Sequence, residues 1–344
     1  MQLPTNHWYP VLQSREVASR PLGVTRLGER LVFWRDSKGT IHAHADRCPH
    51  LGAALSKGSV SGDRLVCAFH GFAFDGEGSC RHIPANGADG KIPKGMATKP
   101  YRVREDHGFV WLWWGEARAS YPAVPFFDEL ATTGWRSTTM AVDWPVHYTR
   151  AIENQLDVAH LAFIHRTTIG RGGRTMVEGP YVEADERAIK VWTTNRRDSG
   201  LPPRSIRELA EAAQGTEPSL TLLFPGIWRL NISSGFKQLL AFVPIDDNNT
   251  RYYLRAYHRI RNPLLAFAAE VVLRRSSRHI LAQDQAIVVT QTPRSSMDAT
   301  EDRLIGADRA IAQFRRLHAR MLERPAPASD RLPVPESAAM ALVL

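Results

Sequence analysis

The strongest constraint in this 344-residue sequence is a set of two cysteines and two histidines in a short span. One residue separates Cys48 from His50, two residues separate Cys67 from His70, and sixteen residues lie between the pairs. Thiolates and imidazoles are the side chains that bind soft and borderline metal ions. We therefore predict that two loops, each with one thiol and one imidazole, converge on a metal centre.

Two kinds of metal centre fit these four side chains. A single zinc ion would take all of them in one tetrahedral site. A two-iron cluster would divide them, with both cysteines on one iron and both histidines on the other, as in Rieske centres. The spacing favours the cluster, because each loop can supply one ligand to each iron. A usual zinc finger instead pairs cysteine with cysteine and histidine with histidine. Zinc remains the alternative at this point.

Composition is that of a folded protein with more than one domain. Hydrophobic residues make up 43% and charged residues 23%, and the length exceeds that of a typical single domain. The longest apolar stretch, 263–273, is shorter than the roughly 20 residues that a membrane span needs. Residues 1–17 show no signal-peptide pattern. We expect no membrane association.

The charge and the third cysteine bear on partners and location. The formal charge of +9 favours acidic partners, but the basic residues are scattered, so we expect a solvated surface and no nucleic-acid binding. The sequence contains only three cysteines, Cys48, Cys67 and Cys80, which are too few for a disulfide framework. We therefore expect a cytoplasmic protein, and Cys80 receives no role.

The N-terminal part reads as short strands separated by turns, and the C-terminal part mixes helices with strands. We predict an α+β protein in which an all-β domain precedes a domain built on an antiparallel sheet. The domain limits are 1–118 and 119–324, followed by a flexible tail at 325–344, which is rich in Pro, Ala and Ser. The predicted strands are 30–34, 41–44, 64–68, 108–114, 220–230, 238–243 and 251–260, and the predicted helices are 147–164, 266–287 and 302–322. Two long loops, 166–180 and 195–218, are expected to be binding loops or lids.

Residues 48–58 (CPHLGAALSKG) and 62–75 (GDRLVCAFHGFAFD) resemble the Rieske domain of the Rieske non-haem iron oxygenases, and residues 8–11 (WYPV) and 107–113 (HGFVWLW) resemble its flanks. The sequence departs from the family pattern at Leu51, Ala68-Phe69 and Phe72, positions that touch the packing of the cluster. The resemblance implies a [2Fe-2S] cluster on Cys48, His50, Cys67 and His70. It also implies a helix-grip catalytic domain after the Rieske domain, as in the smaller class that includes vanillate demethylase and phthalate oxygenase.

A second metal centre follows from the same resemblance. In residues 153–165 (ENQLDVAHLAFIH), His160 and His165 match the ligands of a mononuclear Fe(II), Asp157 matches a bridge toward a cluster histidine of a neighbouring subunit, and Asn154 matches a polar neighbour of the iron. Five helical residues turn through about 140° beyond a full turn, so both histidines reach one ion only if the helix is distorted near Phe163.

The third iron ligand is expected on a later helix. Residues 283–291 (QDQAIVVTQ) resemble the third-ligand helix of the family, so we predict Asp284, with Asp198, Asp246 and Asp247 as rivals. Two histidines and one carboxylate leave positions free for dioxygen.

The resemblance implies an oxygenase component that uses O2 to hydroxylate or oxidatively demethylate a small, largely apolar substrate, aromatic or cyclic. Alternatives are ring cis-dihydroxylation and, in a different class, an electron carrier or ligand-binding protein without oxygenase activity. No ferredoxin module or NAD fingerprint is found, so electrons must come from NAD(P)H through a separate reductase or ferredoxin. The family resemblance implies a homotrimer. Arg204, Arg229 and Lys237 are possible partners for a substrate carboxylate.

Overall fold

The structure is a computed structural model that describes residues 1–323. The predicted tail at 325–344 lies outside the described residues. The strands are β1 (His7–Gln13), β2 (Leu22–Arg26), β3 (Glu29–Arg35), β4 (Ile41–Ala45), β5 (Ser59–Ser61), β6 (Arg64–Val66), β7 (Ala73–Phe74), β8 (Cys80–His82), β9 (Pro100–Tyr101), β10 (Val103–Asp106), β11 (Phe109–Trp114), β12 (Arg136–Trp144), β13 (Met176–Ala184), β14 (Ala188–Arg196), β15 (Leu220–Leu223), β16 (Ile227–Ser233), β17 (Phe236–Asp246) and β18 (Asn249–His258). The α-helices are α1 (Asp128–Ala131), α2 (Tyr148–Leu156), α3 (Leu161–Ile164), α4 (Ile206–Ala213), α5 (Pro263–Val288) and α6 (Arg309–Glu323), and the short 3-10 helices are η1 (Ser14–Glu16), η2 (Leu55–Lys57), η3 (Pro84–Asn86), η4 (Ser296–Asp298) and η5 (Gly306–Asp308).

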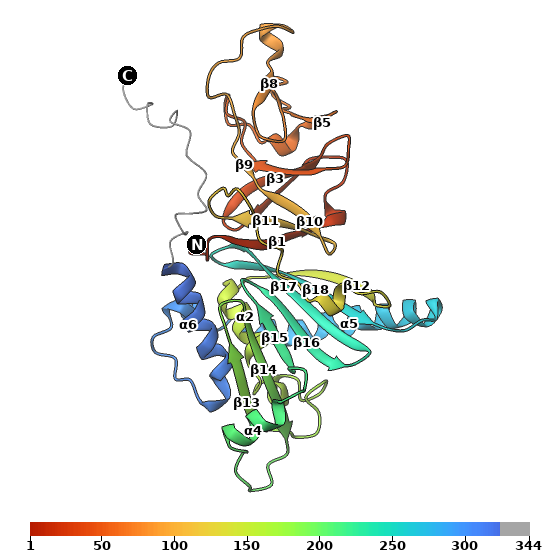
Figure 1. The fold of residues 1–344 in the computed structure, drawn as a ribbon, viewed down its shortest axis with the longest axis vertical. Helices are drawn as coiled ribbons and strands as arrows, with labels where there is room; N and C mark the ends of the chain where they lie inside the picture. The colour runs from red at the N-terminus through yellow and green to blue at the C-terminus, as the bar shows by residue number, and fades with distance from the viewer. Residues whose placement is uncertain (324–344) are drawn as a thin grey trace.

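Three small antiparallel sheets build the N-terminal part, in the orders β1-β11-β10, β2-β3-β4-β9 and β5-β6-β7-β8. The predicted strands at 30–34, 41–44, 64–68 and 108–114 correspond to β3, β4, β6 and β11. The sheet of β5 to β8 lies at one end of the molecule, remote from α4 at the other end (Figure 1). The two cysteine and histidine loops belong to this end.

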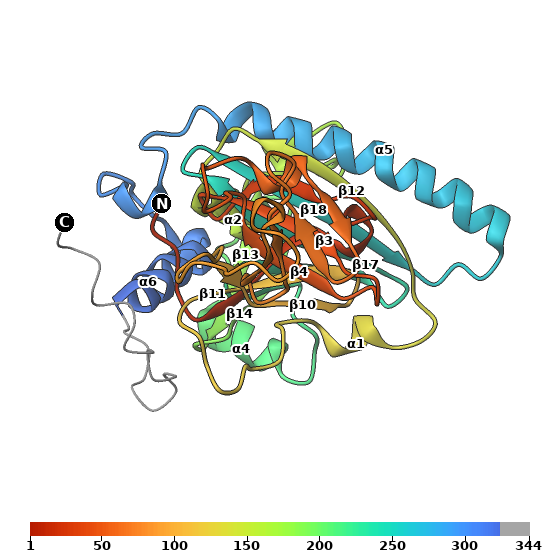
Figure 2. The same cartoon turned by 90° about the horizontal axis from the view of Figure 1, so that it is seen from above.

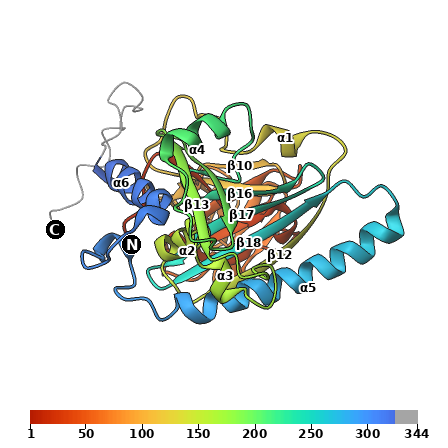
Figure 3. The same ribbon diagram turned by 90° about the horizontal axis from the view of Figure 1, so that it is seen from below.

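The C-terminal part contains one seven-stranded antiparallel sheet in the order β12-β18-β17-β16-β15-β14-β13. Seen from above, the N-terminal sheets overlie β17 and β18, and α5 runs along the side next to β12 (Figure 2). Seen from below, α2, α3 and α5 lie on the opposite side of the sheet (Figure 3). The α+β class with an antiparallel sheet is therefore confirmed.

The two faces of the large sheet have different partners because side chains alternate along a strand. Ile227, Leu239 and Tyr253 pack in one core with tryptophans of the N-terminal part, including Trp8 and Trp111. Backbone hydrogen bonds also join the two parts, from the Leu27 amide to the Pro244 carbonyl at 2.8 Å and from Gly28 to Ile245 at 3.0 Å. The N-terminal part is thereby fixed to one face, and the other face is left for the helices.

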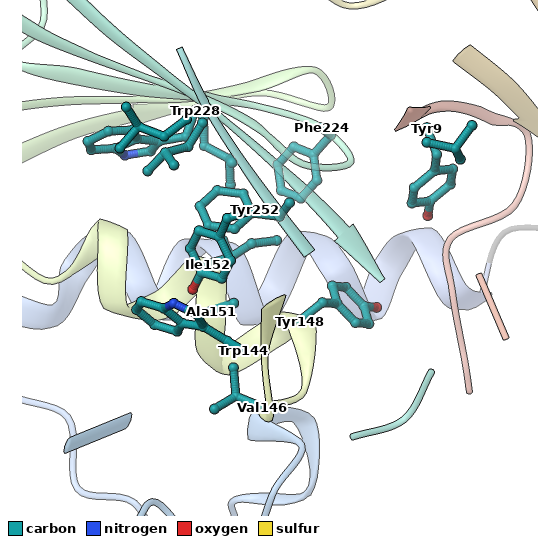
Figure 4. Close-up of a cluster of buried hydrophobic side chains, with 14 of the residues drawn as sticks. Tyr9, Trp144, Val146, Tyr148, Ala151, Ile152, Phe224, Trp228 and Tyr252 are labelled. Carbon is teal, nitrogen blue, oxygen red and sulfur yellow. The ribbon is translucent and has the colours of Figure 1, made fainter. Parts of the chain in front are cut away.

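The second core holds α2 against the free face of the sheet. Trp144, Ile152 and Tyr252 are fully buried there, and the rings of Trp144 and Tyr252 lie 4.3 Å apart between their centroids (Figure 4). Complete burial of such side chains contributes on the order of 1.5–3 kcal/mol each. This packing fixes the C-terminal end of α2, where the second predicted metal centre begins.

Two sequence expectations were wrong in this domain. The strand expected at 220–230 is a hairpin of β15 and β16, because Pro225 has no amide hydrogen for a ladder and Gly226 completes the turn. The loop expected at 195–218 contains α4, whose first turn is capped by Ser205 and Glu208, each side chain accepting a hydrogen bond from the other's backbone amide. In addition, β13 begins within the other predicted loop, at Met176.

None of the helices in residues 1–323 combines the length and apolar character that a membrane crossing requires.

Candidate metal centres

The first centre has its thiols inside and its imidazoles outside. Cys48 and Cys67 are buried, whereas His50 and His70 are exposed at the loop tips. The two imidazole rings lie 4.7 Å apart between centroids. Phe72 stacks on the His50 ring at 4.6 Å, nearly parallel to it. This separation into a sulfur pair and a nitrogen pair fits the divided ligand set of a two-iron cluster.

Tight turns give each loop its shape. The Cys48 amide donates to the Ala53 carbonyl at 2.7 Å, and the Cys67 amide donates to the Phe72 carbonyl at 2.9 Å. Each turn places a glycine at positive φ, Gly52 at 77° and Gly71 at 71°, a conformation that side chains disfavour. The glycines therefore allow both loops to close around the buried thiols.

Burial also sets the protonation of the Cys48 thiol. Desolvation raises the pKa of the Cys48 thiol to about 11, although the backbone amide of His50 opposes the rise. The thiol is therefore protonated at neutral pH in the protein alone, and a metal must displace that proton to bind. Cys80 is also buried, and its Sγ donates to the His82 carbonyl at 3.4 Å in the core beneath the loops.

The second centre brings together His160, His165 and Asp284, with one ligand atom of each within 4.8 Å of the others. The Asp284 Oδ1 atom lies 3.0 Å from His165 Nε2 and 3.6 Å from His160 Nε2. Asp284 comes from α5, so a carboxylate more than a hundred residues along the chain completes the set. Within residues 1–323, no other three histidine, cysteine or acidic side chains meet this closely.

The two histidines face one point because the helix is interrupted between α2 and His160. Helix α2 ends at Leu156, and Asp157 has an extended backbone with ψ 125°. Asp157 Oδ1 accepts the amides of Ala159 at 2.7 Å and His160 at 3.2 Å, so it holds the turn that leads into α3. The expected helix at 147–164 is therefore interrupted, and the distortion precedes His160 instead of lying near Phe163. Asp157 is also not on a continuous helix with His160.

Asp157 and His165 have perturbed pKa values whose causes lie in these contacts. Burial acts to raise the pKa of Asp157, but its interactions with His160 and the Ala159 amide outweigh burial and lower it. Burial acts to lower the pKa of His165, but the Asp284 carboxylate and the Gln283 amide oxygen raise it. Asp157 Oδ1 lies 3.7 Å from His160 Nδ1.

Asp284 has the surroundings of a metal ligand. Its side chain is only 2% exposed, and Oδ1 faces the two imidazole Nε2 atoms without forming a hydrogen bond within the described part of the chain. A buried carboxylate oxygen without a partner is costly unless a cation neutralises it. The donor set, two imidazoles and one carboxylate, is that of non-haem iron sites. These residues fit a mononuclear iron.

Gln283 and Thr168 are polar contacts that the sequence did not reveal. Gln283 Oε1 lies 3.0 Å from His165 Nδ1, and the Thr168 hydroxyl donates to the same oxygen at 3.2 Å. The only sequence feature that could have indicated Gln283 as a site residue is its position next to Asp284.

The other predicted site residues lie elsewhere. Asp198 accepts the Gly200 amide, Asp246 accepts from Asn248 and Asn249, and Asp247 pairs with the N-terminus. Asn154 is buried and accepts a hydrogen bond from Gln155 at 2.9 Å. Gln155 lines the cavity described next, and Asn154 does not.

A cavity of about 370 Å³ opens beside the second centre. It lies between the large sheet and α5, and most of its wall is apolar. The lining residues that matter here are His160, Ile169, Trp228, Gln238, Leu240 and Leu281. Residues from the predicted strands 220–230 and 238–243 both contribute to the lining. From the predicted loop 195–218 only Asn195 takes part.

Comparison with known families identifies both parts of the chain. Residues 7–101 match the Rieske [2Fe-2S] domain, and residues 144–324 match the vanillate O-demethylase oxygenase C-terminal domain. An N-terminal Rieske domain joined to an α+β domain of this kind defines the oxygenase subunits of the Rieske non-haem iron oxygenases. The second match covers more than half of the chain, and the chain belongs to the family with the vanillate O-demethylase oxygenase C-terminal domain. The [2Fe-2S] assignment replaces the zinc alternative.

Individual relatives are distant. The chain is 34% identical over 186 residues to the chloroplastic protein TIC 55 of Arabidopsis thaliana, covering 54% of this chain and 34% of that protein. It is 29% identical over 237 residues to a vanillate O-demethylase oxygenase subunit of a Pseudomonas species, covering 65% and 66%. The chain thus spans only part of the length of the curated relatives that it matches. The fold is similar to that of dicamba monooxygenase, with a TM-score of 0.75 at 20% identity, over 94% of this chain and 98% of that one.

Proposed function

We propose that this chain is an oxygenase component that uses O2 to hydroxylate or oxidatively demethylate a small, largely apolar substrate with an aromatic or cyclic body. The convergence of His160, His165 and Asp284 at the wall of an apolar cavity carries this proposal. An electron carrier would need neither the buried, unpartnered carboxylate oxygen nor a substrate-sized space beside it. Ring dihydroxylation is the alternative outcome for the product.

Each residue has a defined task in the proposal. Cys48, His50, Cys67 and His70 hold the [2Fe-2S] cluster, and His160, His165 and Asp284 hold the mononuclear iron. Iron(II) at this position supplies dioxygen activation. Gln283 orients the His165 ring, and the apolar wall excludes water and places the substrate against the metal site. Asp157, next to His160, is the residue through which the second centre meets a neighbouring subunit.

The arrangement of the two centres supports a head-to-tail homotrimer. In one chain the loops near β5 and β8 lie at the end of the molecule away from α2 and α4 (Figure 1). Leu51 and Phe69 beside the cluster loops are 65% and 60% exposed, and Phe163 and Ile169 beside the second centre are 64% and 58% exposed. Two apolar patches of this kind suit contact between copies. The cluster of one chain would then serve the second centre of the next.

Electrons come from a separate reductase or ferredoxin that oxidises NAD(P)H, and the charge of +9 suits an acidic donor. The proposal also includes a Rieske domain at 1–118 and a catalytic domain at 119–324. It further includes a cytoplasmic location.

Metal analysis tests the proposal directly. Purified protein should hold about three irons per chain, two of them in a cluster with a Rieske spectrum. Replacing His160 and His165 together by alanine should leave about two irons and an unchanged cluster spectrum. Zinc in place of iron, or two irons in the unsubstituted protein, would contradict the proposal.

A further inference from the structure

We infer that the cavity beside the second centre selects an uncharged, elongated hydrophobic molecule larger than one aromatic ring, and that it rejects a carboxylate of the same shape. The inference rests on the proposed function, because it concerns the substrate of that site. It is carried by the charges, the hydrogen bonds and the length of the cavity wall.

No lysine or arginine side chain lines the described cavity wall. Among the described residues that line the cavity, the ionisable side chains are the three metal-site residues His160, His165 and Asp284, together with Asp157 beside them. The residues at the other end of the cavity are neutral. A substrate carboxylate placed there would leave water and find no counter-charge, which is strongly unfavourable.

The three basic residues considered from the sequence are already paired elsewhere. Lys237 lies 2.9 Å from Glu217, Arg204 lies 3.1 Å from Glu178, and Arg229 contacts Glu129.

Besides its contact with Glu129, the position of Arg229 on its strand directs it away from the cavity. Trp228 and Leu230, its neighbours on β16, line the cavity, so the alternation of side chains directs Arg229 to the opposite face. Its guanidinium stacks 4.7 Å from the centre of the Phe127 ring on that face.

Several of the polar groups in the wall are satisfied by the protein itself. The Asn195 amide donates to the Val158 carbonyl at 2.9 Å, and the Ser219 hydroxyl donates to the Thr193 carbonyl at 3.1 Å. These groups strengthen the wall and add no charge. Gln238 is also neutral and can offer a substrate no more than an amide hydrogen bond.

The cavity is longer than a single ring. Leu273, Ser277, Ile280, Leu281 and Asp284 all line it, at the spacing of one face of α5. The eleven residue steps from Leu273 to Asp284 correspond to about 16 Å along the helix. A buried cavity of about 150 Å³ accommodates benzene, and this one measures about 370 Å³. The space suits two fused rings or a ring with an apolar extension.

Binding of matched compounds to the iron-loaded protein tests the inference without turnover. Equilibrium dialysis should compare 2-methoxynaphthalene with 6-methoxy-2-naphthoate, which differ by one carboxylate, and with anisole, which has one ring. We expect 2-methoxynaphthalene to bind at least about tenfold more tightly than either, a difference of roughly 1.4 kcal/mol. Equal affinities, tighter binding of the naphthoate or of anisole, or binding of none of the three overturns the inference. The iron content of the same preparation reports separately on the proposed function.

One substitution should reverse the charge preference. Gln238→Arg introduces a guanidinium at the cavity wall, and it should increase the affinity for 6-methoxy-2-naphthoate at least about tenfold. The matched control is Gln214→Arg, on the exposed C-terminal end of α4, which should change neither affinity. A thermal melt establishes that both variants are folded. Unchanged naphthoate binding by a folded Gln238→Arg protein counts against the charge argument.

Discussion

Gln283 and His165 are 118 residues apart in the chain, yet the amide oxygen of Gln283 lies 3.0 Å from the Nδ1 atom of His165. An amide oxygen accepts hydrogen bonds and does not donate them, so Nδ1 carries the hydrogen and Nε2 keeps its lone pair. Asp284, the next residue on α5, faces that Nε2 atom at 3.0 Å. Gln283 thus orients the His165 ring through Nδ1, and Asp284 places a second proposed ligand beside Nε2.

Gln283→Ala should weaken metal binding at the second centre, because partners behind metal-binding histidines typically contribute 10–100-fold to affinity. Dialysis against a graded chelator series, followed by iron analysis, measures the loss. The cluster absorbance should not change. Gln285→Ala, on the same helix but outside the cavity wall, is the control. Equal iron retention by the two variants would rule out this role for Gln283.

Asp157→Asn should lower reductase-coupled turnover by about 10–100-fold while both metal centres remain loaded. The amide keeps an oxygen that can accept the Ala159 and His160 backbone hydrogens, so the turn should survive. Asp185→Asn is a matched control, because Asp185 accepts two backbone amides in a turn remote from the site. Wild-type turnover by Asp157→Asn would refute the bridging task.

Gly170→Ala should cost the protein its mononuclear iron. A Cβ atom on Gly170 would lie 1.8 Å from the Leu161 carbonyl oxygen, within the turn whose Gly170 amide donates to the His165 carbonyl. The backbone that carries His165 must therefore move. Iron analysis should give about two irons per chain, with the cluster intact. Gly235→Ala meets no atom within 4 Å and should retain about three. Full iron content in both would be the contrary result.

Leu51→Ser combined with Phe69→Ser should convert the proposed trimer to monomers, because the substitutions remove the exposed apolar surface beside the cluster loops. Light scattering on the purified protein measures the mass. Leu201→Ser combined with Ile206→Ser removes similarly exposed side chains near α4 and should leave the trimer intact. A trimer that persists in the first variant, or a monomeric wild type, would contradict this interface.

Acid should destabilise the protein through His318. Burial, aided by the charge of His147, lowers the pKa of His318 to about 4, and the side chain shares a hydrogen bond with the Tyr148 hydroxyl. The unfolded chain titrates near 6.5, so between about pH 6.5 and 4 it binds more protons than the folded protein, and the free energy of unfolding falls as pH falls, by roughly 3 kcal/mol in all.

His318→Gln removes this titration and should show a smaller loss of melting temperature between pH 7.5 and pH 5 than the wild type. An identical loss in both proteins would assign the acid sensitivity to other groups.

Local patterns predicted the parts of the site that are local in the chain. The spacing of Cys48, His50, Cys67 and His70 is contained within two turns, and the class of the large sheet follows from alternating strands. Local signals were also overlooked: Pro225-Gly226 marked the turn of a hairpin, and Ser205 with Glu208 marked the start of α4. Both elements therefore lay within reach of the sequence.

The remainder depends on contacts that close only in three dimensions. The break after α2 arises because the Asp157 side chain captures two backbone amides, a choice that competes with helix continuation. The contact of Gln283 with His165 requires α5 to pass beside the C-terminal end of α3. Neither could be derived from helical periodicity alone.

Helix α5 supplies both Asp284 and the length of the cavity wall from Leu273 onward. Its backbone hydrogen bonds hold Asp284 in place whatever side chains stand one, two or three turns earlier. Point substitutions at positions 273, 277 and 280 can therefore remodel which molecule is accepted without rebuilding the metal-binding end. During evolution, substrate specificity could therefore change along one helix while the metal-binding residues stay the same.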